Sequence, residues 1–309
     1  MDQRIELRHL RYFLAVAEEL HFGRAAQRLH IAQPALSQQI RQLEKIVGVE
    51  LFQRTSRSVR LTDAGASFQP RARDLLSRLA ADLDEAGRVG RGESGRLDVA
   101  FITSATAIVS ERLRAFSRHR PDVQVKLHDG FTVDVLTALE RGTADVGIVR
   151  DAEERSGIAL TPLATERLVA VVPAHHPAAR GDRLGVTALA ADPLILFPRS
   201  AGPHAFDLNT QPLREAGIDV QVAQECSNWH TIIMLVAAGL GITIAPHSVT
   251  TLLPPGARRL ELDGSPHVSR ILMATRQGDN RPLVQAFIAA PETMKISVDG
   301  RSAKAQRIR

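Results

Sequence analysis

The sequence predicts a protein in two parts: a small helical N-terminal domain, then a long connecting helix that leads to a larger α/β region. Three observations support this fold class. The chain has 309 residues, more than a single hydrophobic core usually holds. Through about the first ninety residues, apolar side chains recur every three or four positions, which is typical of amphipathic helices. From 96 to 290, strand-like and helix-like patterns alternate, which is typical of α/β architecture.

Composition indicates a globular protein of a reducing compartment. The apolar fraction is 44% and the charged fraction 24%, both ordinary values. No apolar run reaches the length of a membrane span, and the first residues lack the apolar segment of a signal peptide. The single cysteine, Cys226, cannot form an internal disulfide or a multi-cysteine zinc site. We therefore expect a cytoplasmic location and no contact with a membrane.

The first two helices are predicted at 7–19 and shortly after Gly23. The first carries one apolar stripe, which consists of Leu10, Phe13, Leu14 and Ala17. The second is short, and its inward positions are Ala25, Ala26 and Leu29. The small alanines allow a third helix to approach closely. A three-residue turn, 30–32, leads into that helix.

A third helix is predicted from about Gln33 to Val47, with Pro34 in its first turn, where a missing N–H costs nothing. Its apolar positions, which we expect to be buried, are Leu36, Ile40, Leu43 and Val47. The opposite face presents Gln33, Ser37, Gln38, Arg41 and Lys45. Amide, hydroxyl and guanidinium groups of this kind can contact base edges and phosphates. The alternative is an ordinary solvated helix face.

The next segment, 50–62, is predicted to form a short hairpin with Arg54 and Arg57 at or near its tip. Such a hairpin can act as a wing that reaches the minor groove or the flanking phosphates. Between Arg24 and Arg60 the sequence holds seven basic residues but only two acidic ones, Glu44 and Glu50. A phosphate backbone is the expected partner of this excess, with a solvated charged face as the alternative.

A long helix is predicted from about Thr62, within a connecting segment at 63–92. Its apolar stripe recurs at intervals of three and four and comprises Phe68, Ala72, Leu75, Leu79, Leu83 and Ala86. The stripe can form a seam with the same helix of a second subunit, or it can pack on its own domain. Glycines at 87, 90, 92 and 95 are expected to break the helix and to form a flexible hinge.

The N-terminal residues 6–65 resemble the DNA-binding domain of LysR-type regulators, most specifically in the run AAQRLHIAQPALSQQIRQLE. One departure is Ala32, where many members have Ser or Thr; the third helix then lacks a side-chain cap worth about 1 kcal/mol. The run LVAAGLGITIAP, 235–246, is also typical of this family. The resemblance implies a winged helix-turn-helix in residues 1–62. The expected DNA-binding residues are Arg24, Gln33, Pro34, Ser37, Gln38, Arg41, Arg54 and Arg57.

The same resemblance implies a transcription regulator that binds double-stranded DNA and a small-molecule effector. Paired connecting helices would present two recognition helices, so the expected operator is an imperfect inverted repeat. Family members assemble as homo-oligomers, here a dimer or a tetramer, and RNA polymerase is a further candidate partner.

The resemblance also implies a two-lobed sensor, similar to periplasmic binding proteins, over residues 93–292. Lobe I is expected at 93–163 and 266–292, and lobe II at 164–265. The chain would then cross between the lobes near Leu163 and Ser265. The tail 293–309 is polar, basic and aperiodic, so we expect it to be disordered.

Hydroxyl side chains follow the strands of the first lobe, where ligands bind in open α/β sheets. Thr103 and Ser104 follow the first strand, and Thr132 opens a later helix; hydroxyl caps are the alternative. Arg150 ends another strand and can clamp a carboxylate, or it can form a surface ion pair with Asp151 or Glu153.

In the LysR branch that senses aromatic acids and their breakdown products, residues resembling Ser104, Thr132 and Arg150 line the effector cleft. The segment 193–203, which contains Phe197 and Pro198, also resembles that branch. The resemblance therefore implies a small carboxylate effector.

Enzyme and metal signals are absent from the sequence, and no cofactor is expected. It contains no G-x-S-x-G, P-loop or H-E-x-x-H motif. His175 and His176 are expected in a loop rather than at a metal. Cys226 could sense oxidants only with a partner thiol, which the chain lacks. The rival functions are a solute-binding protein, which needs a signal peptide, and an enzyme on the same fold, which needs a catalytic constellation.

Overall fold

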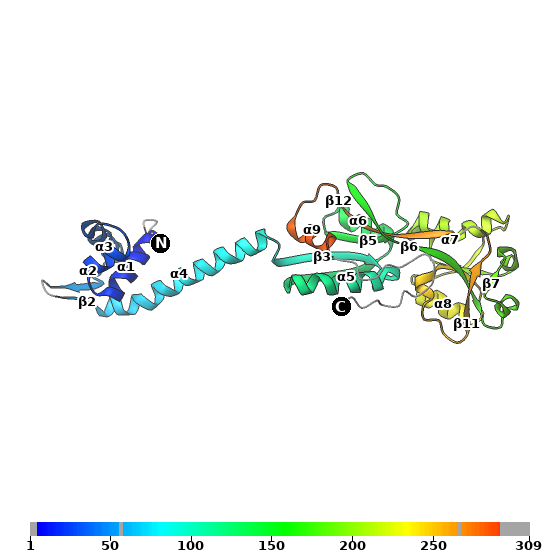
Figure 1. Cartoon of the computed structure of the whole chain (residues 1–309), viewed down its shortest axis with the longest axis horizontal. Coiled ribbons are helices and arrows are strands. Elements are labelled where there is room, and N and C mark those ends of the chain that lie inside the picture. Colours follow the sequence, from blue (N-terminus) through cyan, green and yellow to red (C-terminus); the bar gives the residue numbers. More distant parts are fainter. Residues whose placement is uncertain (1–4, 56–57, 265–266, 291–309) are drawn as a thin grey trace, which may run out of the picture. The chain divides into compact units, whose positions relative to one another are not determined.

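A computed structural model describes residues 5–55, 58–264 and 267–290 (Figure 1). The chain divides into two compact units, one up to Arg88 and one from Val89 onward. Three expectations fall outside the described residues: the position of Arg57, the second crossing at Ser265, and the tail 293–309.

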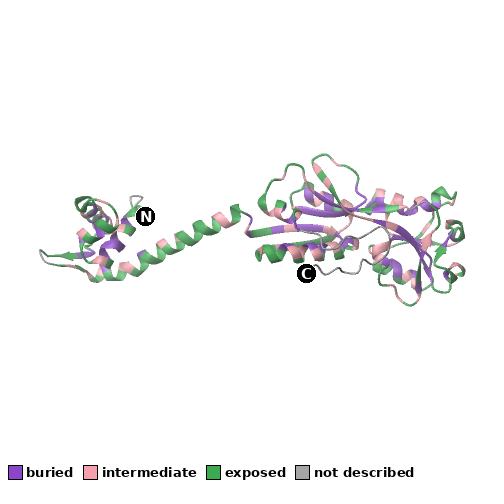
Figure 2. Ribbon diagram, in the orientation of Figure 1, coloured by how far each residue is buried: buried purple, intermediate pink, exposed green. Residues whose placement is uncertain are grey.

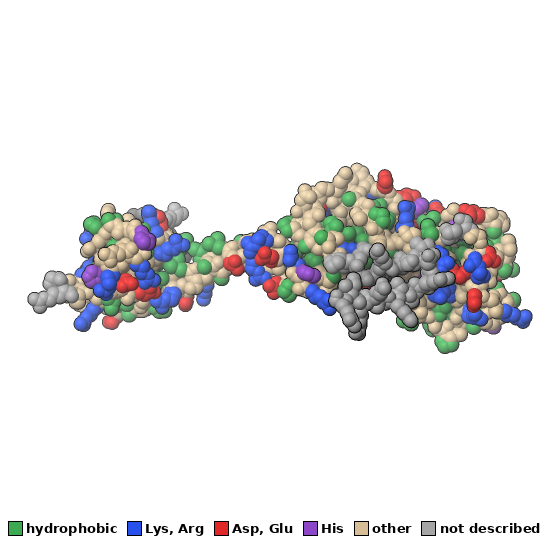
Figure 3. Space-filling model, in the orientation of Figure 1, with side chains coloured by type: hydrophobic (Ala, Val, Ile, Leu, Met, Phe, Trp, Pro, Cys, Tyr) green, Lys and Arg blue, Asp and Glu red, His purple; other side chains and the backbone are tan. Residues whose placement is uncertain are grey.

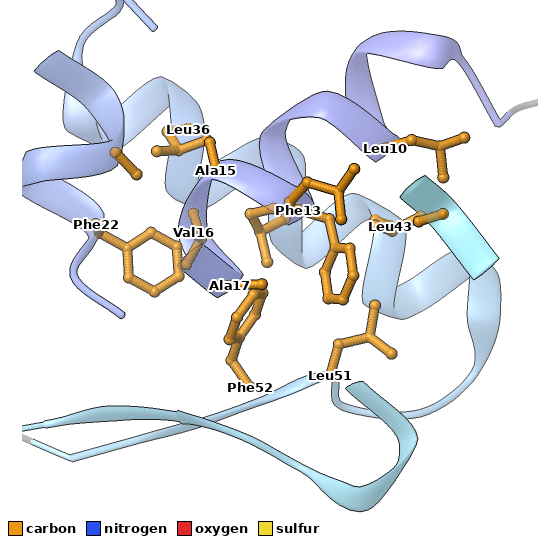
Figure 4. Packing of buried hydrophobic residues seen from close by; sticks show 14 of the residues in the cluster. Leu10, Phe13, Ala15, Val16, Ala17, Phe22, Leu36, Leu43, Leu51 and Phe52 are labelled. Atoms are coloured by element: carbon orange, nitrogen blue, oxygen red, sulfur yellow. The ribbon is translucent and has the colours of Figure 1, made fainter. Parts of the chain in front are cut away.

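The N-terminal unit is a helix-turn-helix domain with a two-stranded wing. Its elements are α1 (Leu7–Glu19), α2 (Phe22–Arg28), α3 (Gln33–Val47), β1 (Phe52–Arg54), β2 (Val59–Leu61) and α4 (Asp63–Gly90). Strand β1 pairs antiparallel with β2. Phe13 on α1 lies at the centre of the core, with its ring centroid 5.3 Å from that of Phe52 and 5.1 Å from that of Phe68 (Figure 4). The wing therefore packs on the helices through Leu51 and Phe52, both almost fully buried.

The expected apolar face of α3 is correct except at its end. Leu36, Ile40 and Leu43 are fully buried, but Val47 is 39% exposed, so the expectation that it is buried is wrong. Helical periodicity gives the face on which a side chain lies but not how far along the axis the neighbouring elements extend. Val47 is the last residue of α3, which ends at Gly48 in the left-handed conformation (φ +83°).

Helix α4 runs through Pro70 and Gly87 without interruption, so the expectation that Gly87 breaks it is wrong. Ala72 is buried in the N-terminal core, whereas Leu75 and Leu83 are 55% and 65% exposed. Figure 2 shows exposed residues along most of this helix. The apolar stripe beyond Ala72 therefore has few partners within the described part of its own chain.

The first lobe of the second unit contains a mixed sheet. Its strands are β3 (Ser94–Ile102), β4 (Asp122–Gly130), β5 (Val146–Arg150) and β12 (Val268–Arg276). β4 and β5 are parallel to β3, and β12 is antiparallel to β5. The helices of this lobe are η1 (Thr103–Ala105), α5 (Thr106–His119), α6 (Thr132–Glu140) and α9 (Pro282–Ile288). The carboxyl ends of β3, β4 and β5 therefore lie at one edge of the sheet.

The second lobe contains strands β7 (Arg183–Leu184), β8 (Leu194–Leu196), β9 (Val222–Glu225), β10 (Thr243–Pro246) and β11 (Ala257–Leu262). Its α-helices are α7 (Pro203–Glu215) and α8 (Trp229–Ala237). Its 3₁₀ helices are η2 (Pro177–Arg180), η3 (Val186–Leu189), η4 (Arg199–Ala201) and η5 (His247–Thr250). The sequence did not predict β7 or β11.

A single long strand, β6 (Ile158–Pro173), belongs to both lobes. Residues 158–167 pair with β12, and residues 168–173 pair with β10 and β11. The change of partner therefore falls between Arg167 and Leu168, a few residues beyond the crossing expected near Leu163. The sequence pattern had indicated only the second half of this strand.

The segment after α4 is held more tightly than a flexible hinge. Gly92 has a φ of +66°, and a Cβ at this position would lie 2.8 Å from Cβ of Pro282. Glycine is therefore required for the close approach of this segment to the start of α9.

Candidate DNA-binding surface and ligand cleft

The polar face of α3 is accessible in the N-terminal unit. Gln33, Pro34, Gln38 and Arg41 are exposed and Ser37 is half-buried, on the face opposite the buried leucines and isoleucine. Ala32 provides no side-chain cap, so the first-turn amides of α3 have no capping side chain. Hydroxyl, amide and guanidinium groups and backbone N–H groups are thus presented together.

Acidic neighbours neutralise part of the basic surface. Arg24 forms an ion pair with Glu19 (3.3 Å), and Arg28 forms one with Glu18 (2.9 Å). Hydrogen bonds from Arg73 and Arg28 lower the pKa of the Glu18 carboxyl. Figure 3 shows acidic side chains beside basic ones on the visible face of this unit. The excess of basic residues counted between Arg24 and Arg60 therefore overstates the free positive charge. Glu18 and Glu19 precede that range, but they pair with two of its arginines.

Three basic residues of this surface keep their charge unpaired. Arg41, Lys45 and Arg60 are exposed and form no ion pair with any other residue in the described ranges. These side chains, rather than Arg24, supply the uncompensated positive charge available to phosphates.

Arg54 lies at the end of β1, and its side chain is held against the helices. It donates to Oε2 of Glu44 on α3 (2.6 Å), and its guanidinium lies 4.8 Å from the ring centroid of Phe22. The other oxygen of Glu44 accepts the backbone N–H groups of Leu51 and Phe52. Glu44 and Arg54 therefore fix the wing to α3.

A cleft lies between the two lobes of the second unit. Its inner part, here called the inner cleft, has a cavity volume of about 50 Å³. It is lined by Ile102, Thr103, Ser104, Gly130, Phe131, Thr132, Arg150, Phe197, Ala201, Gly202, Ala205, Ser227, Asn228, Trp229 and Ile232. An adjoining outer cleft of about 670 Å³ shares seven of these residues and adds Thr106, Ala107, Asp129, His230, Ser248 and Val249. Every residue of the first lobe in the inner cleft follows β3, β4 or β5, or ends one of them.

Arg150 is the one charged side chain of the inner cleft, and it is buried (4% exposed). Its Nε donates to Oγ of Ser104 (3.2 Å), and its Nη1 donates to Oγ of Ser269 (2.8 Å). The same Nη1 lies 2.7 Å from Oε1 of Glu166, which is also buried. Its Nη2 is buried and has no hydrogen-bond partner among the described residues. A buried guanidinium nitrogen without a partner favours a ligand that accepts a hydrogen bond.

The alternative expected for Arg150 was a surface ion pair with Asp151 or Glu153, but the structure shows a different ion pair. Its partner is Glu166 of β6, not Asp151 or Glu153, and the pair is internal rather than on the surface. Asp151 accepts instead from Ser269 Oγ and from the backbone N–H of Arg270, both at 2.6 Å. Burial raises the pKa of the Asp151 carboxyl.

Four of the other expected ligand residues lie in the inner cleft, and the hydroxyls of three of them have different roles. The Thr132 hydroxyl is already used, since it donates to the carbonyl of Arg150 and accepts its N–H. Ser104 accepts from Arg150 and keeps its own proton, and Thr103 is exposed. Phe197 lines the inner cleft, but Pro198 is not among the lining residues and precedes η4.

The sequence reasoning missed the contribution of α8. Asn228 caps this helix by accepting the N–H of Thr231 (2.8 Å), and Trp229 packs edge-to-face on Phe197 (5.7 Å). An asparagine before an apolar helical run was a readable capping signal. Its place in the cleft could not be read, because it depends on how the two lobes face each other.

Other residues considered from the sequence have structural roles. His176 bonds Asp192 (3.0 Å) and caps η2, and the described residues contain no group of three or more potential metal ligands. Cys226 is half-buried and packs against the core of the second lobe. Within the described ranges, no helix combines the length and hydropathy needed to cross a membrane.

Both units match family models and known proteins. Residues 7–66 match the bacterial regulatory helix-turn-helix protein of the lysR family, and residues 90–292 match the LysR substrate binding domain. The uncharacterized regulator YnfL of Escherichia coli (strain K12) is 41% identical over 79% of this chain and 83% of that protein. The transcriptional regulator AlsR of Bacillus subtilis (strain 168) is 34% identical over 92% of this chain and 94% of its own.

A solved structure of full-length CbnR in complex with its target DNA is similar as well. It covers 92% of this chain and 97% of its own, with a TM-score of 0.77 and 29% sequence identity. The helix-turn-helix with its wing, the ligand cleft and these matches over nearly the whole chain lead to one conclusion. This protein belongs to the LysR family and is a DNA-binding transcription regulator with an effector-binding domain.

Proposed function

We propose that this regulator reads an imperfect inverted repeat with α3 and that a small carboxylate in the inner cleft changes its binding to DNA. The observation that carries the effector assignment is Nη2 of Arg150, a buried guanidinium nitrogen without a partner among the described residues, on a side chain that lines the inner cleft. The protein acts on the chromosome, hence in the cytoplasm, and by binding rather than by catalysis.

The assignment of α3 to base contacts rests on its chemistry and accessibility. Gln33 and Gln38 can form paired hydrogen bonds with adenine, and Arg41 can bind guanine or a phosphate. Arg24 and Pro34 lie at the starts of α2 and α3, where they flank this face. Arg54 supports the wing, and Arg57 remains a candidate for phosphate contact from its sequence position alone.

The assembly proposed for DNA binding is a homo-oligomer with paired α4 helices. The exposure of Leu75 and Leu83 supports it, because large apolar side chains on one helix face are stabilised by a partner. Two-fold pairing presents two copies of α3, so the DNA operator is expected to contain two half-sites.

The effector proposed for the inner cleft is a small carboxylate with an apolar body. One oxygen would accept from Nη2 of Arg150 and the other from the Ser104 hydroxyl. Phe131, Phe197 and Trp229 would contact the apolar body. Such a ligand touches both lobes, so it favours one arrangement of them, and only by its difference in affinity for the two.

A fluorescence titration tests this effector assignment. Trp229 is the only tryptophan of the chain, so its emission reports on the cleft directly. The full-length protein is titrated with a panel of small aromatic and aliphatic acids and, in parallel, melted. A ligand at 100 times its Kd adds about 2.7 kcal/mol of stability. A panel in which only the neutral amides shift the emission and the melting temperature would refute the carboxylate assignment.

A further inference from the structure

The charges around the inner cleft limit the charge of its ligand. Among the residues that the structure describes, Arg150 is the only formally charged side chain that lines the inner cleft, and its positive charge already has a counter-ion. Nη1 lies 2.7 Å from Oε1 of Glu166, and both side chains are at most 5% exposed. The pair is therefore neutral before any ligand enters.

Glu166 is held in this position from the second lobe. Its Oε2 accepts the backbone N–H of Ser248 (2.5 Å), and its Oε1 accepts the hydroxyl of the same residue (2.9 Å). Ser248 lies in η5 and lines the outer cleft, and its two hydrogen bonds hold the carboxylate of Glu166 at both oxygens. Such an anchored carboxylate cannot turn away when a ligand arrives without breaking two hydrogen bonds.

Two of the helix starts around the cleft, those of α6 and α8, supply little further positive potential, whereas the starts of η1 and α5 have no side-chain cap. At α6, the Asp134 side chain accepts the N–H of Phe131 (3.0 Å), so a negative charge already lies in the first turn. At α8, the Asn228 side chain takes the N–H of Thr231. Both caps use backbone donors that would otherwise be available to an anion.

The remaining ionisable groups near the cleft do not favour a second negative charge. Asp151 is linked to Arg150 through Ser269 and adds a carboxyl group but no cation to this region. Among the described residues that line the outer cleft are one acidic side chain, Asp129, and the imidazole of His230.

Resting on the effector function proposed above, we propose that the inner cleft selects monoanions and that Glu166 determines this specificity. One ligand carboxylate accepts hydrogen bonds from Nη2 of Arg150 and from the hydroxyl of Ser104. A second carboxylate on the same ligand would be desolvated without a compensating cation, at a distance from Glu166 where like charges repel. The ligand class is therefore a monocarboxylate with an uncharged apolar body, rather than a dicarboxylate.

The test compares ligands that differ only in the second charge. Terephthalate is titrated against its monomethyl ester, and adipate against its monomethyl ester, by Trp229 emission on the full-length protein. A pH of 8 is used because imidazoles of ordinary pKa are uncharged there. In the wild type, each monoester is expected to bind about tenfold more tightly than its diacid, or better, which corresponds to about 1.4 kcal/mol.

The variant Glu166→Gln removes the counter-ion and keeps a carbonyl acceptor for Ser248. In this variant the preference for the monoester should shrink by about tenfold or reverse. The matched control is Glu261→Gln, which removes a carboxylate from an ion pair with Arg167 outside the cleft and should leave the preference unchanged. The wild-type ligand pairs provide the test even if Glu166→Gln does not fold.

The outcomes separate this inference from the effector function on which it rests. Diacids that bind the wild type as tightly as their monoesters overturn the monoanion selection and leave a carboxylate effector intact. A monoester preference that Glu166→Gln leaves unchanged overturns the role of Glu166. If neither monoesters nor diacids bind while neutral esters do, the carboxylate effector itself is refuted.

Discussion

At the scale of single residues, Arg150 links ligand binding to the stability of the fold. It is buried at the end of β5 and shares Glu166 with Ser248 of the second lobe. Removing one partner of a buried ion pair lowers the free energy of unfolding more than removing both partners does, because it leaves an uncompensated buried charge. A simple alanine substitution therefore changes two properties at once.

A comparison of two variants separates these properties. Arg150→Ala leaves Glu166 buried without its cation and should lower the free energy of unfolding by about 3–5 kcal/mol. The double variant Arg150→Met with Glu166→Gln should lose much less, because no charge remains unpaired. Both should fail to bind carboxylates. Denaturant unfolding monitored by far-UV circular dichroism measures the difference, and equal losses of stability would contradict the internal pairing.

Asp151 gives a pH dependence of the opposite sign to that of Asp98, Asp207 and Asp279, whose carboxyl pKa values are lowered. Because burial raises the pKa of its carboxyl, the folded protein keeps a proton that the unfolded chain releases as the pH rises past the ordinary value. The stability associated with this group is therefore present at low pH and falls as the pH rises through the raised pKa. Asp151→Asn should raise the melting temperature at pH 8 by a few degrees, and this gain should vanish toward pH 4. Asparagine also suits the left-handed backbone of this position (φ +45°).

Asp98 provides the control with the reverse sign. Arg96 and His128 lower the pKa of its carboxyl, so its stabilising effect is lost as the pH falls through that lowered value. Asp98→Asn should therefore lower the melting temperature at pH 8 and have little effect in acid. Melting curves from pH 4 to 8 compare the two variants, and the same sign of change in both at pH 8 would rule out the assigned causes.

At the scale of elements, α3 combines a buried face with an accessible polar one. Gln33→Ala and Ser37→Ala should weaken binding to a specific operator by about 1–3 kcal/mol for each lost base contact. Binding to unrelated DNA should change little. Arg41→Ala instead should weaken both kinds of binding and lower the salt slope by about one, if it contacts a phosphate. Fluorescence anisotropy at several salt concentrations measures this, and equal losses on both DNAs for Gln33→Ala would assign it to the backbone.

The wing depends on α3 through Glu44 and Arg54. Since Arg54 already bonds Glu44 and contacts Phe22, replacing it should loosen the hairpin as well as remove a charge. An effect of Arg54→Ala on DNA binding is therefore interpretable only beside its effect on stability. The expectation that Arg54 reaches the minor groove or the flanking phosphates considered only its place near the tip of the hairpin.

Helix α4 carries the predicted seam of the dimer. Leu75→Glu with Leu79→Glu should abolish cooperative binding to two half-sites, because two carboxylates in each helix would face their copies. The control is Ser77→Glu, which adds a charge at an exposed position outside the stripe. Footprints on DNA with one and two half-sites compare them. A wild-type footprint confined to a single half-site would contradict the paired assembly, whereas sensor contacts alone can keep a variant dimeric.

At the scale of the whole molecule, periodicity and the family motifs predicted the order of the elements. Which side chains meet in the cleft depends on how the strands pair, and the sequence does not show that pairing directly. Thr103, Ser104, Thr132 and Arg150 were found in advance because parallel strands end at one edge of a sheet. Glu166 was not, since its contact with Arg150 depends on β12 pairing with both β5 and β6. Strand β11 was missed because its two adjacent arginines mask the alternation of its apolar side chains.

The central claim is that occupation of the inner cleft changes the affinity for DNA. It is tested on an operator that the full-length protein selects from random DNA. The Kd for this operator is measured with and without a saturating monocarboxylate, in the wild type and in the double variant Arg150→Met with Glu166→Gln. The account predicts a change in Kd of about fivefold or more in the wild type, and none in the variant, whose basal Kd stays close to that of the wild type. An equal response of both proteins, or a wild type that binds the acid with no change in its affinity or bending of the operator, would contradict it.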